Sequence, residues 1–488
     1  MVHSGTPASD WIKAAARIVP SERQLAWQEM EFYAFIHFTV NTFTDREWGT
    51  GDEDPALFAP TELDARQWVR ACKSAGMTGL ILTCKHHDGF CLWPSKHTDH
   101  TVSASPWREG RGDLVREVAE ACREGGLRFG IYLSPWDRHE PSYGDSARYN
   151  AFFLNQLREL LTGYGELFCV WFDGACGEGP NGKRQEYDWP AYYALIRELQ
   201  PGAVISVCGP DVRWCGNEAG CVRSSEWSVV PAHMQDNEKI QAESQQVDDG
   251  QFASRIGTQD DDLGSREVIR RHSRLIWYPA EVNTSIRPGW FYHASEDDQV
   301  KSLEELLAVY YGAVGGNATF LLNLPPDKRG LIHERDLERL NELGNHLRET
   351  FRDNLALLAR AEASEARGEK HTPAMVLDGD KQTYWSPREG TEQAWLQLEL
   401  PGRAIFDRIV LMEHIRSGQR IERFRLDART CDGSWQEIYC GTVVGYKRIC
   451  CFDPVEADAV RLTIEQSRWC PTLSGFGIYR STAKEARA

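Results

Sequence analysis

Hydrophobic and polar positions along the chain follow a repeated helix-then-strand pattern. After Asp64, apolar side chains recur at helical spacing through position 75, and Gly76 follows as a stop signal. The apolar run TGLILTC (78–84) comes next and predicts a buried strand. Asp113 and Asp188 precede two further helical stretches of the same kind.

This pattern continues to about residue 325 and predicts a parallel sheet. Strands are expected to start near residues 33, 78, 127, 167 and 203, with later candidates at 222–227, 275–282 and 318–324. Helices between successive strands imply βαβ units. Eight such units favour an α/β (β/α)8 TIM-like barrel, which we assign to residues 1–350. A doubly wound sheet is the weaker alternative, because no GxGxxG opens a helix after any strand.

The pattern changes near residue 355. The segments that follow are short apolar or alternating runs separated by turn residues: WLQLEL, FDRIVLMEH, ERFRLDAR, WQEIYCG, VRLTIEQ and GFGIYR. Short strands at this spacing are typical of all-β domains. We therefore expect a C-terminal β-sandwich over residues 355–485.

The composition of the chain argues against nucleic-acid and membrane partners. The 72 acidic and 55 basic residues give a net charge of −17, which argues against nucleic acid because phosphate contacts need clustered Lys and Arg. No run approaches the ~18 apolar residues that a membrane helix needs. The 14 cysteines include no CxxC, and the N-terminus has no apolar signal-peptide core. We expect a cytoplasmic protein with reduced thiols and no membrane partner.

Side chains at the ends of the predicted strands are the candidates for chemistry, because a (β/α)8 barrel carries its active site there. They mix imidazole, carboxyl and aromatic groups. That mixture suits a sugar, whose hydroxyls need hydrogen bonds and whose C–H faces need aromatic contact. The candidates are His37, His86, His87, Tyr132, Trp136, Asp173, Glu226, Glu281 and Asn323.

Asp173 is the strongest single candidate. It ends the apolar run FCVWF and precedes Gly174, so a barrel strand would present it into open space, although an isolated FDG more often begins a turn. Glycoside hydrolysis commonly needs a second carboxyl group across the scissile bond. The candidate partners are Glu218, in the loop-like stretch RWCGNEAG (213–220), Glu226 and Glu281.

Other chemistries have less support. Adjacent His86 and His87 would point to opposite faces of an ideal strand, and HTDH (97–100) has no established zinc spacing, so hydroxyl binding is favoured over a metal. No GxSxG is present for acyl transfer. Cys215 and Cys221 flank Glu218, and their placement fits either a bracing disulfide or two free thiols.

Six stretches, in order over about 260 residues, resemble the α-L-fucosidases of glycoside hydrolase family 29. They are FIHFTVNTFTDREWG (35–49), LTCKHHDGFCLWPSKHTDHTV (82–102), GIYLSPWDRH (130–139), VWFDGA (170–175), RWCGNEAGCVRSSEWS (213–228) and EVNTSIRPGWFYH (281–293). GNEAG followed by EWS, with SIRPGWFYH, is similar to the branch selective for α-1,3/1,4-linked fucose in Lewis-type glycans.

The resemblance implies a retaining exo-α-L-fucosidase that needs no cofactor or metal and acts on a fucosylated oligosaccharide or glycoconjugate. Asp173 corresponds to the nucleophile and Glu218 to the acid/base. The positions that match the fucose pocket are His37, Glu47, Trp48, His86, His87, Tyr132 and Trp290. The alternatives are a broader α-L-fucosidase that also cleaves α-1,2 links, a carbohydrate-binding protein without catalysis, and a metal-dependent hydrolase.

The C-terminal region carries a shorter resemblance. VLDGDKQTYWSP (376–387) is similar to the discoidin-like, or coagulation factor 5/8 type C, module. Such modules sometimes bind carbohydrate or calcium. Docking against the barrel and glycan binding are equal alternatives for its role here.

Overall fold

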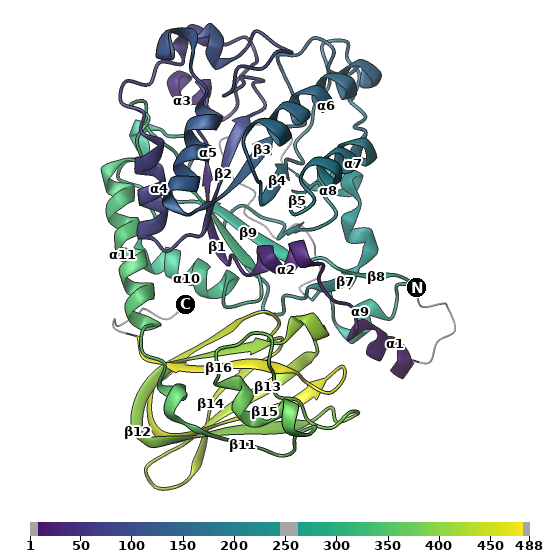
Figure 1. The fold of residues 1–488 in the computed structure, drawn as a ribbon, viewed down its shortest axis with the longest axis vertical. Coiled ribbons are helices and arrows are strands. Elements are labelled where there is room, and N and C mark those ends of the chain that lie inside the picture. The colour runs from purple at the N-terminus through teal and green to yellow at the C-terminus, as the bar shows by residue number, and fades with distance from the viewer. Residues whose placement is uncertain (1–7, 245–261, 482–488) are drawn as a thin grey trace.

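Eight parallel strands form a barrel in the computed structural model, which describes residues 8–244 and 262–481 (Figure 1). The strands follow one another around the ring in chain order, and β1 pairs with both β2 and β10. A bridge between Ser206 and Val212 links β5 to the chain that enters β6. The strands are β1 Phe32–Ile36, β2 Gly79–Lys85, β3 Arg128–Leu133, β4 Cys169–Phe172, β5 Val204–Val207, β6 Arg213–Trp214, β9 Ala280–Ser285 and β10 Thr319–Asn323. The predicted TIM-like barrel is confirmed.

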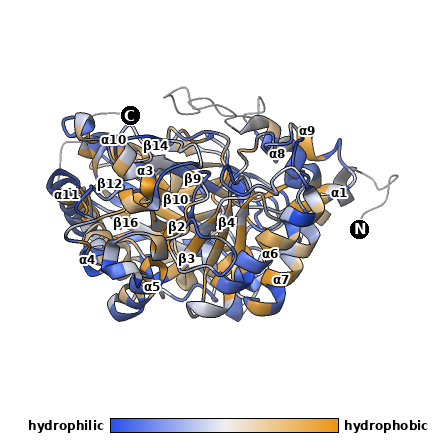
Figure 2. Cartoon of the chain, turned by 90° about the horizontal axis from the view of Figure 1, so that it is seen from above, coloured by the Kyte–Doolittle hydropathy of each residue, from blue (hydrophilic) through white to orange (hydrophobic). Residues whose placement is uncertain are grey.

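Helices surround this ring, and along them hydrophilic and hydrophobic residues are interspersed (Figure 2). The main ones are α4 Ala65–Ser74, α5 Leu114–Gly125, α6 Ser146–Gly163, α7 Trp189–Leu199, α10 Leu303–Ala313 and α11 Glu334–Thr350. The shorter ones are α1 Ala8–Ala15, α2 Glu22–Gln28, α3 Val40–Thr44, α8 Asn237–Glu243 and α9 Arg266–Ile269. No helix in the described part of the chain is both long and apolar enough to cross a membrane.

Aspartates cap three of the surrounding helices at the positions that the sequence predicts. The side chains of Asp64, Asp113 and Asp188 each accept a hydrogen bond from a backbone N–H in the first turn of α4, α5 and α7. Gly126 ends α5 in the left-handed region, with φ at 73°, where a side chain would be strained. These caps satisfy backbone groups that a helix end leaves unpaired, so local signals fix the helix bounds.

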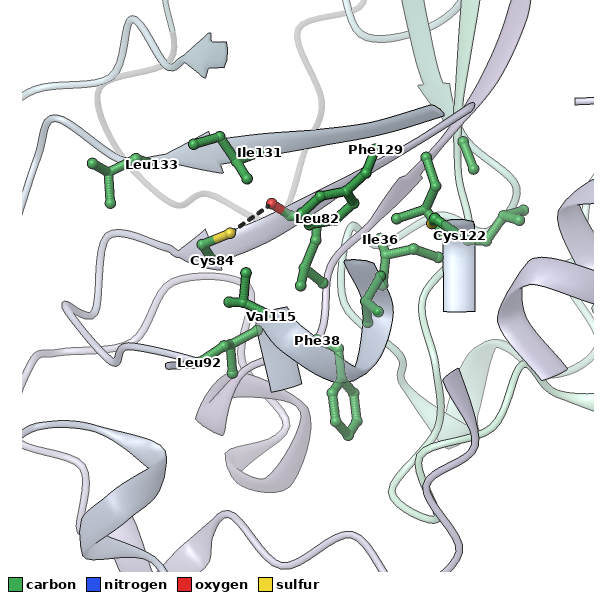
Figure 3. Close-up of a cluster of buried hydrophobic side chains, with 14 of the residues drawn as sticks. Ile36, Phe38, Leu82, Cys84, Leu92, Val115, Cys122, Phe129, Ile131 and Leu133 are labelled. Carbon is green, nitrogen blue, oxygen red and sulfur yellow. Dashed lines mark hydrogen bonds between the residues drawn. The ribbon is translucent and has the colours of Figure 1, made fainter. Parts of the chain in front are cut away.

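The barrel strands are buried on both faces. Outward residues such as Ile36 and Leu82 form one hydrophobic cluster with Val115 of α5 (Figure 3). Residues at the alternate positions, including Phe35 and Trp171, fill the interior of the barrel. Double burial explains why these strands are nearly continuous apolar runs in the sequence.

The sixth and seventh strands differ from the prediction. Residues 222–227 form no strand, and the two-residue β6 lies earlier, in the stretch read as a loop. The run 275–282 divides at Pro279: β8 (Leu275–Trp277) pairs antiparallel with β7 (Val229–Pro231) outside the barrel, and β9 begins at Ala280. Proline has no N–H for a strand ladder, which accounts for the break.

The C-terminal region is an antiparallel β structure with its own hydrophobic core. Its sheet has the order β11-β12-β15-β13-β14, and β16 pairs with β12. The strands are β11 Arg360–Ala363, β12 Ala394–Glu413, β13 Ile421–Arg429, β14 Trp435–Gly441, β15 Arg448–Ser467 and β16 Leu473–Tyr479. In Figure 1 it lies below the barrel, next to β7, β8 and α10.

Candidate active site

A cavity opens where the barrel strands end, and it gathers most of the predicted site residues. Segments far apart in the sequence meet there because a parallel barrel directs all its C-terminal strand ends to one rim. Its lining includes Phe35, His37, Trp48, His86, His87, Tyr132, Trp171, Asp173, Val207, Trp214, Glu218, Ser244, Asn283 and Trp290. Both principal carboxylates, Asp173 and Glu218, therefore face one space.

Asp173 follows directly after β4 and is held by two hydrogen bonds. Its Oδ2 accepts one from the Tyr132 hydroxyl at 3.0 Å, and its Oδ1 accepts one from the Ala175 backbone N–H at 2.9 Å. The side chain keeps 24% of its surface exposed in the cavity. The carboxylate is thus fixed in direction and remains accessible, which is what a nucleophile requires.

Glu218 sits on a tight loop that its neighbour Asn217 braces. The fully buried Asn217 side chain donates to the Cys221 carbonyl at 2.9 Å and accepts hydrogen bonds from the N–H groups of Ala219 and Cys221, each at 3.0 Å. Cys215 and Cys221 are free thiols, so no disulfide braces this loop. The Asn217 side chain therefore braces this loop in the way that a disulfide between Cys215 and Cys221 would have done.

The hydrogen bonds around His37 show that its ring is neutral and can accept a hydrogen bond on Nε2. The Asn323 amide donates to Ser285 Oγ at 2.9 Å and to the Trp290 carbonyl at 2.8 Å, so its Oδ1 is the acceptor for His37 Nδ1 at 2.8 Å. The proton therefore lies on Nδ1 and leaves a lone pair on Nε2. Burial lowers the pKa of His37 to about 3, so the ring stays neutral near pH 7.

The same reasoning applies to His87. Ser134 Oγ donates to the Trp136 carbonyl at 2.7 Å, so it accepts the hydrogen bond from His87 Nδ1 at 2.8 Å. Burial lowers the pKa of His87 to about 4. His87 Nε2 is then unprotonated and lies 3.8 Å from Asp173 Oδ2. Both histidines can accept hydrogen bonds from hydroxyl groups.

His86 also lines the cavity, beside His87. The two rings lie 4.1 Å apart between centroids, because both residues follow the end of β2, beyond a register irregularity at Thr83. The alternation expected of a strand therefore does not separate them, and that expectation was wrong. Burial lowers the pKa of His86 well below its usual value, and its buried Nδ1 has no hydrogen-bond partner among the described residues.

Glu47 lies behind the cavity wall rather than among the residues that line it. Its carboxylate accepts hydrogen bonds from the backbone N–H groups of Trp290 at 2.9 Å and Phe291 at 3.0 Å, and from His293 Nε2 at 2.9 Å. The bonds to Glu47 and Asp45 raise the pKa of His293 to about 9. Glu47 thereby fixes the loop that carries Trp290, and its Oε2 retains a lone pair.

Trp171, Trp214 and Asn283 are among the cavity residues that were not predicted. Trp171 lies two positions before Asp173 on β4, so the strand period of two was a usable signal. Trp214 belongs to the two-residue β6, which no pattern indicates, and its Nε1 donates to Asn283 Oδ1 at 3.1 Å. The predicted Trp136 stands one layer back, against the rings of His87 and Trp48.

Glu226 is excluded as a cavity carboxylate. It lies in the irregular chain before β7 and is absent from the cavity lining. Its side chain is buried in ion pairs with Arg213 and Arg223. The predicted position at a barrel strand end was wrong, because the ion pairs hold this segment outside the strand ladder.

Glu281 does not line the cavity either. It lies near the start of β9, not its end, because that strand continues to Ser285. Its carboxyl group accepts hydrogen bonds from the Tyr33 hydroxyl at 2.5 Å and Trp171 Nε1 at 2.7 Å inside the barrel. It therefore supports Trp171 from below, and burial raises the pKa of Glu281 to about 7.

Comparisons with known proteins agree on one family. Residues 3–350 match the family model described as Alpha-L-fucosidase, and residues 360–474 match the F5/8 type C domain. Alpha-L-fucosidase 1 of Arabidopsis thaliana is 44% identical over 94% of this chain and 87% of its own. A Bacteroides ovatus homologue of known crystal structure superposes with a TM-score of 0.86 at 45% identity, covering 100% of this chain and 78% of that one. A Ruminococcus gnavus GH29 fucosidase in complex with fucose superposes with a TM-score of 0.83 at 32% identity, over 100% and 98%.

The pKa of Glu281 yields a stability prediction. Below pH about 4.5 the group is protonated in both the folded and the unfolded chain. As the pH rises toward 7, the unfolded chain ionises first, so the free energy of unfolding should fall by about 3 kcal/mol relative to Glu281→Gln, which cannot ionise. Urea unfolding from pH 5 to 8 measures the difference. Parallel curves for the two proteins would contradict the raised pKa, and exposed Glu338→Gln controls for the loss of one carboxylate.

Proposed function

The chain belongs to the α-L-fucosidase family, glycoside hydrolase family 29, and we propose that it releases terminal fucose by double displacement through a covalent fucosyl-enzyme. The observation that carries this proposal is the meeting of Asp173 and Glu218 in one cavity with three neutral histidines. Retaining enzymes place the two carboxyl groups about 5–5.5 Å apart, on either side of the scissile bond.

In the first step, Asp173 attacks the anomeric carbon C1. A bond forms between a carboxylate oxygen and C1 while the bond from C1 to the leaving oxygen breaks, and protonated Glu218 gives its proton to that oxygen. The Tyr132 hydroxyl and the Ala175 N–H orient the attacking carboxylate. Fucose is then held as an ester of Asp173.

The second step reverses these roles. Glu218, now a carboxylate, takes a proton from water, and the water oxygen bonds to C1 as the ester bond to Asp173 breaks. Two inversions at C1 give net retention of the anomeric configuration. Both carboxylates return to their starting protonation states, so the cycle balances.

The remaining cavity residues suit the hydroxyl groups and the methyl group of fucose. His37 and His87 offer lone pairs on Nε2, and His86 lines the cavity beside them. Trp48 and Trp290 supply apolar faces, and the methyl group at C5, where other hexoses carry a 6-hydroxyl, fits such a surface. Glu47 acts through the Trp290 loop, which its carboxylate fixes.

We propose selectivity for α-1,3/1,4 links. This rests on the sequence form of the acid/base loop, GNEAG followed by EWS, and on SIRPGWFYH. The first segment bears Glu218 and the second carries Trp290, and both of these residues line the cavity. Broader specificity that includes α-1,2 links is the competing proposal.

Removal of the nucleophile tests the mechanism. Asp173→Gly should lower turnover by about three to six orders of magnitude while leaving the fold intact, because the covalent step is lost. Azide, small enough to occupy the vacated space, should then restore turnover of an aryl fucoside and yield β-fucosyl azide by a single inversion. Product analysis by NMR identifies the anomer. Wild-type turnover in the variant, or rescue that yields α-fucosyl azide, would refute the assignment.

Linkage preference can be measured on three trisaccharides side by side. Fucose release from Lewis a and Lewis x should have a kcat/KM at least about tenfold higher than release from 2′-fucosyllactose, a difference of about 1.4 kcal/mol in the transition state. Comparable values for all three would establish the broader specificity instead. Absence of fucose release from all three would favour a carbohydrate-binding role without catalysis.

A further inference from the structure

We propose that the C-terminal β-sandwich positions the acid/base, with Gln419 as the positioning residue. The proposal rests on the assignment of Glu218 as the proton donor. Gln419 belongs to the sandwich, between β12 and β13, and is fully buried. It acts through the chain segment that follows Glu218, and it does not touch the substrate.

Buried ion pairs and a hydrogen bond connect the loop that carries Glu218 to residues 223–228, the segment that follows it. Arg223 donates to the Cys215 carbonyl, at the start of the loop, at 2.8 Å, and pairs with Glu226 at 3.4 Å. Arg213 of β6 pairs with the other oxygen of Glu226. All three charged side chains are at most 4% exposed. Any shift of residues 223–228 is therefore transmitted to the base of the Glu218 loop.

Gln419 holds that segment from the sandwich side. Its Oε1 accepts a hydrogen bond from the Ser228 backbone N–H at 2.8 Å, and its Nε2 donates to the Glu226 carbonyl at 3.4 Å. One side-chain amide thus satisfies a backbone donor and a backbone acceptor two residues apart, as a neighbouring strand would. The contact fixes both the position and the direction of the chain at Glu226.

Two further contacts hold the same segment. Thr442 of the sandwich bonds Ser225 Oγ at 2.8 Å and the Ser224 carbonyl at 3.2 Å. Asn317, just before β10, donates to the Glu226 carbonyl at 2.8 Å and accepts a hydrogen bond from the Tyr446 backbone N–H at 2.7 Å. The back of the acid/base loop is thereby enclosed between the barrel and the sandwich.

A proton donor depends strongly on such support. General acid catalysis needs hydrogen-bond reach to the leaving oxygen, and small misplacements cost large factors in rate. Asp173, by contrast, directly follows a barrel strand and is oriented by hydrogen bonds from Tyr132 and Ala175. Loosening the sandwich contact should therefore impair protonation while sparing nucleophilic attack.

The test compares leaving groups in Gln419→Ala. We expect kcat/KM to fall about tenfold on a Lewis-type trisaccharide, whose leaving oxygen needs the proton. On a dinitrophenyl fucoside, whose leaving group needs none, we expect less than a twofold change. The alkaline fall in kcat/KM reports the pKa of the proton donor. The pH at which this fall occurs should also shift in Gln419→Ala. Gln397→Ala is the matched control, because within the described part of the chain the Gln397 side chain bonds only to Arg461 and Glu399, both in the sandwich.

Glu218→Gln, measured on the same two substrates, separates the possible failures. A loss confined to the trisaccharide in both Glu218→Gln and Gln419→Ala supports the proposal. The same loss in Glu218→Gln alone, or an equal loss on both substrates in Gln419→Ala, overturns the positioning role and leaves the mechanism intact. No leaving-group dependence in Glu218→Gln refutes the acid itself, and this inference with it.

A milder variant covers the case in which Gln419→Ala does not fold. Thr442→Val removes only a hydroxyl at the surface of the same contact. It should show the same substrate-dependent loss at about two- to threefold. If Thr442→Val changed kcat/KM by the same factor on both substrates, that result would count against the proposal.

Discussion

A closed ring of parallel strands is the constraint on which the rest of this protein depends. Parallel pairing sends every C-terminal strand end to one rim, so residues from positions 37 to 290 meet in one cavity. Burial on both faces of each strand makes that rim rigid. The position of Asp173 follows directly from β4, whereas Glu218 stands on a loop and needs support from Asn217.

Burial sets the protonation states around this cavity. The three histidines that line it are neutral because charged imidazolium is poorly solvated there. The hydrogen bonds of Asn323 and Ser134 place the protons of His37 and His87 on Nδ1, and so aim lone pairs at hydroxyl donors. Hydrogen-bond acceptors beside the cavity thus follow from the amide and hydroxyl groups that bond these histidines from behind.

Local patterns predicted most of the fold, and pairing between distant segments accounts for what they missed. The first five strands and the aspartate caps follow from apolar runs and single capping residues. The two-residue β6 exists only by pairing with β9, and no local signal reveals it. Glu281 was misplaced because the pattern did not show that β9 continues past it. Asp173 was a candidate from its place at the end of an apolar run, and Glu218 was one of three candidate partners. The resemblance supplied their roles, and only the folded chain shows that they meet.

The central claim is a covalent bond between fucose and Asp173. A 2-deoxy-2-fluoro-fucosyl fluoride tests it most directly. Fluorine at C2 slows both displacements, but the reactive fluoride leaving group keeps the first one fast enough for the ester to accumulate. Mass spectrometry of a peptic digest should find one 2-fluorofucosyl group, attached to Asp173. A label on Glu218, or full activity with no label after prolonged incubation, would contradict the account.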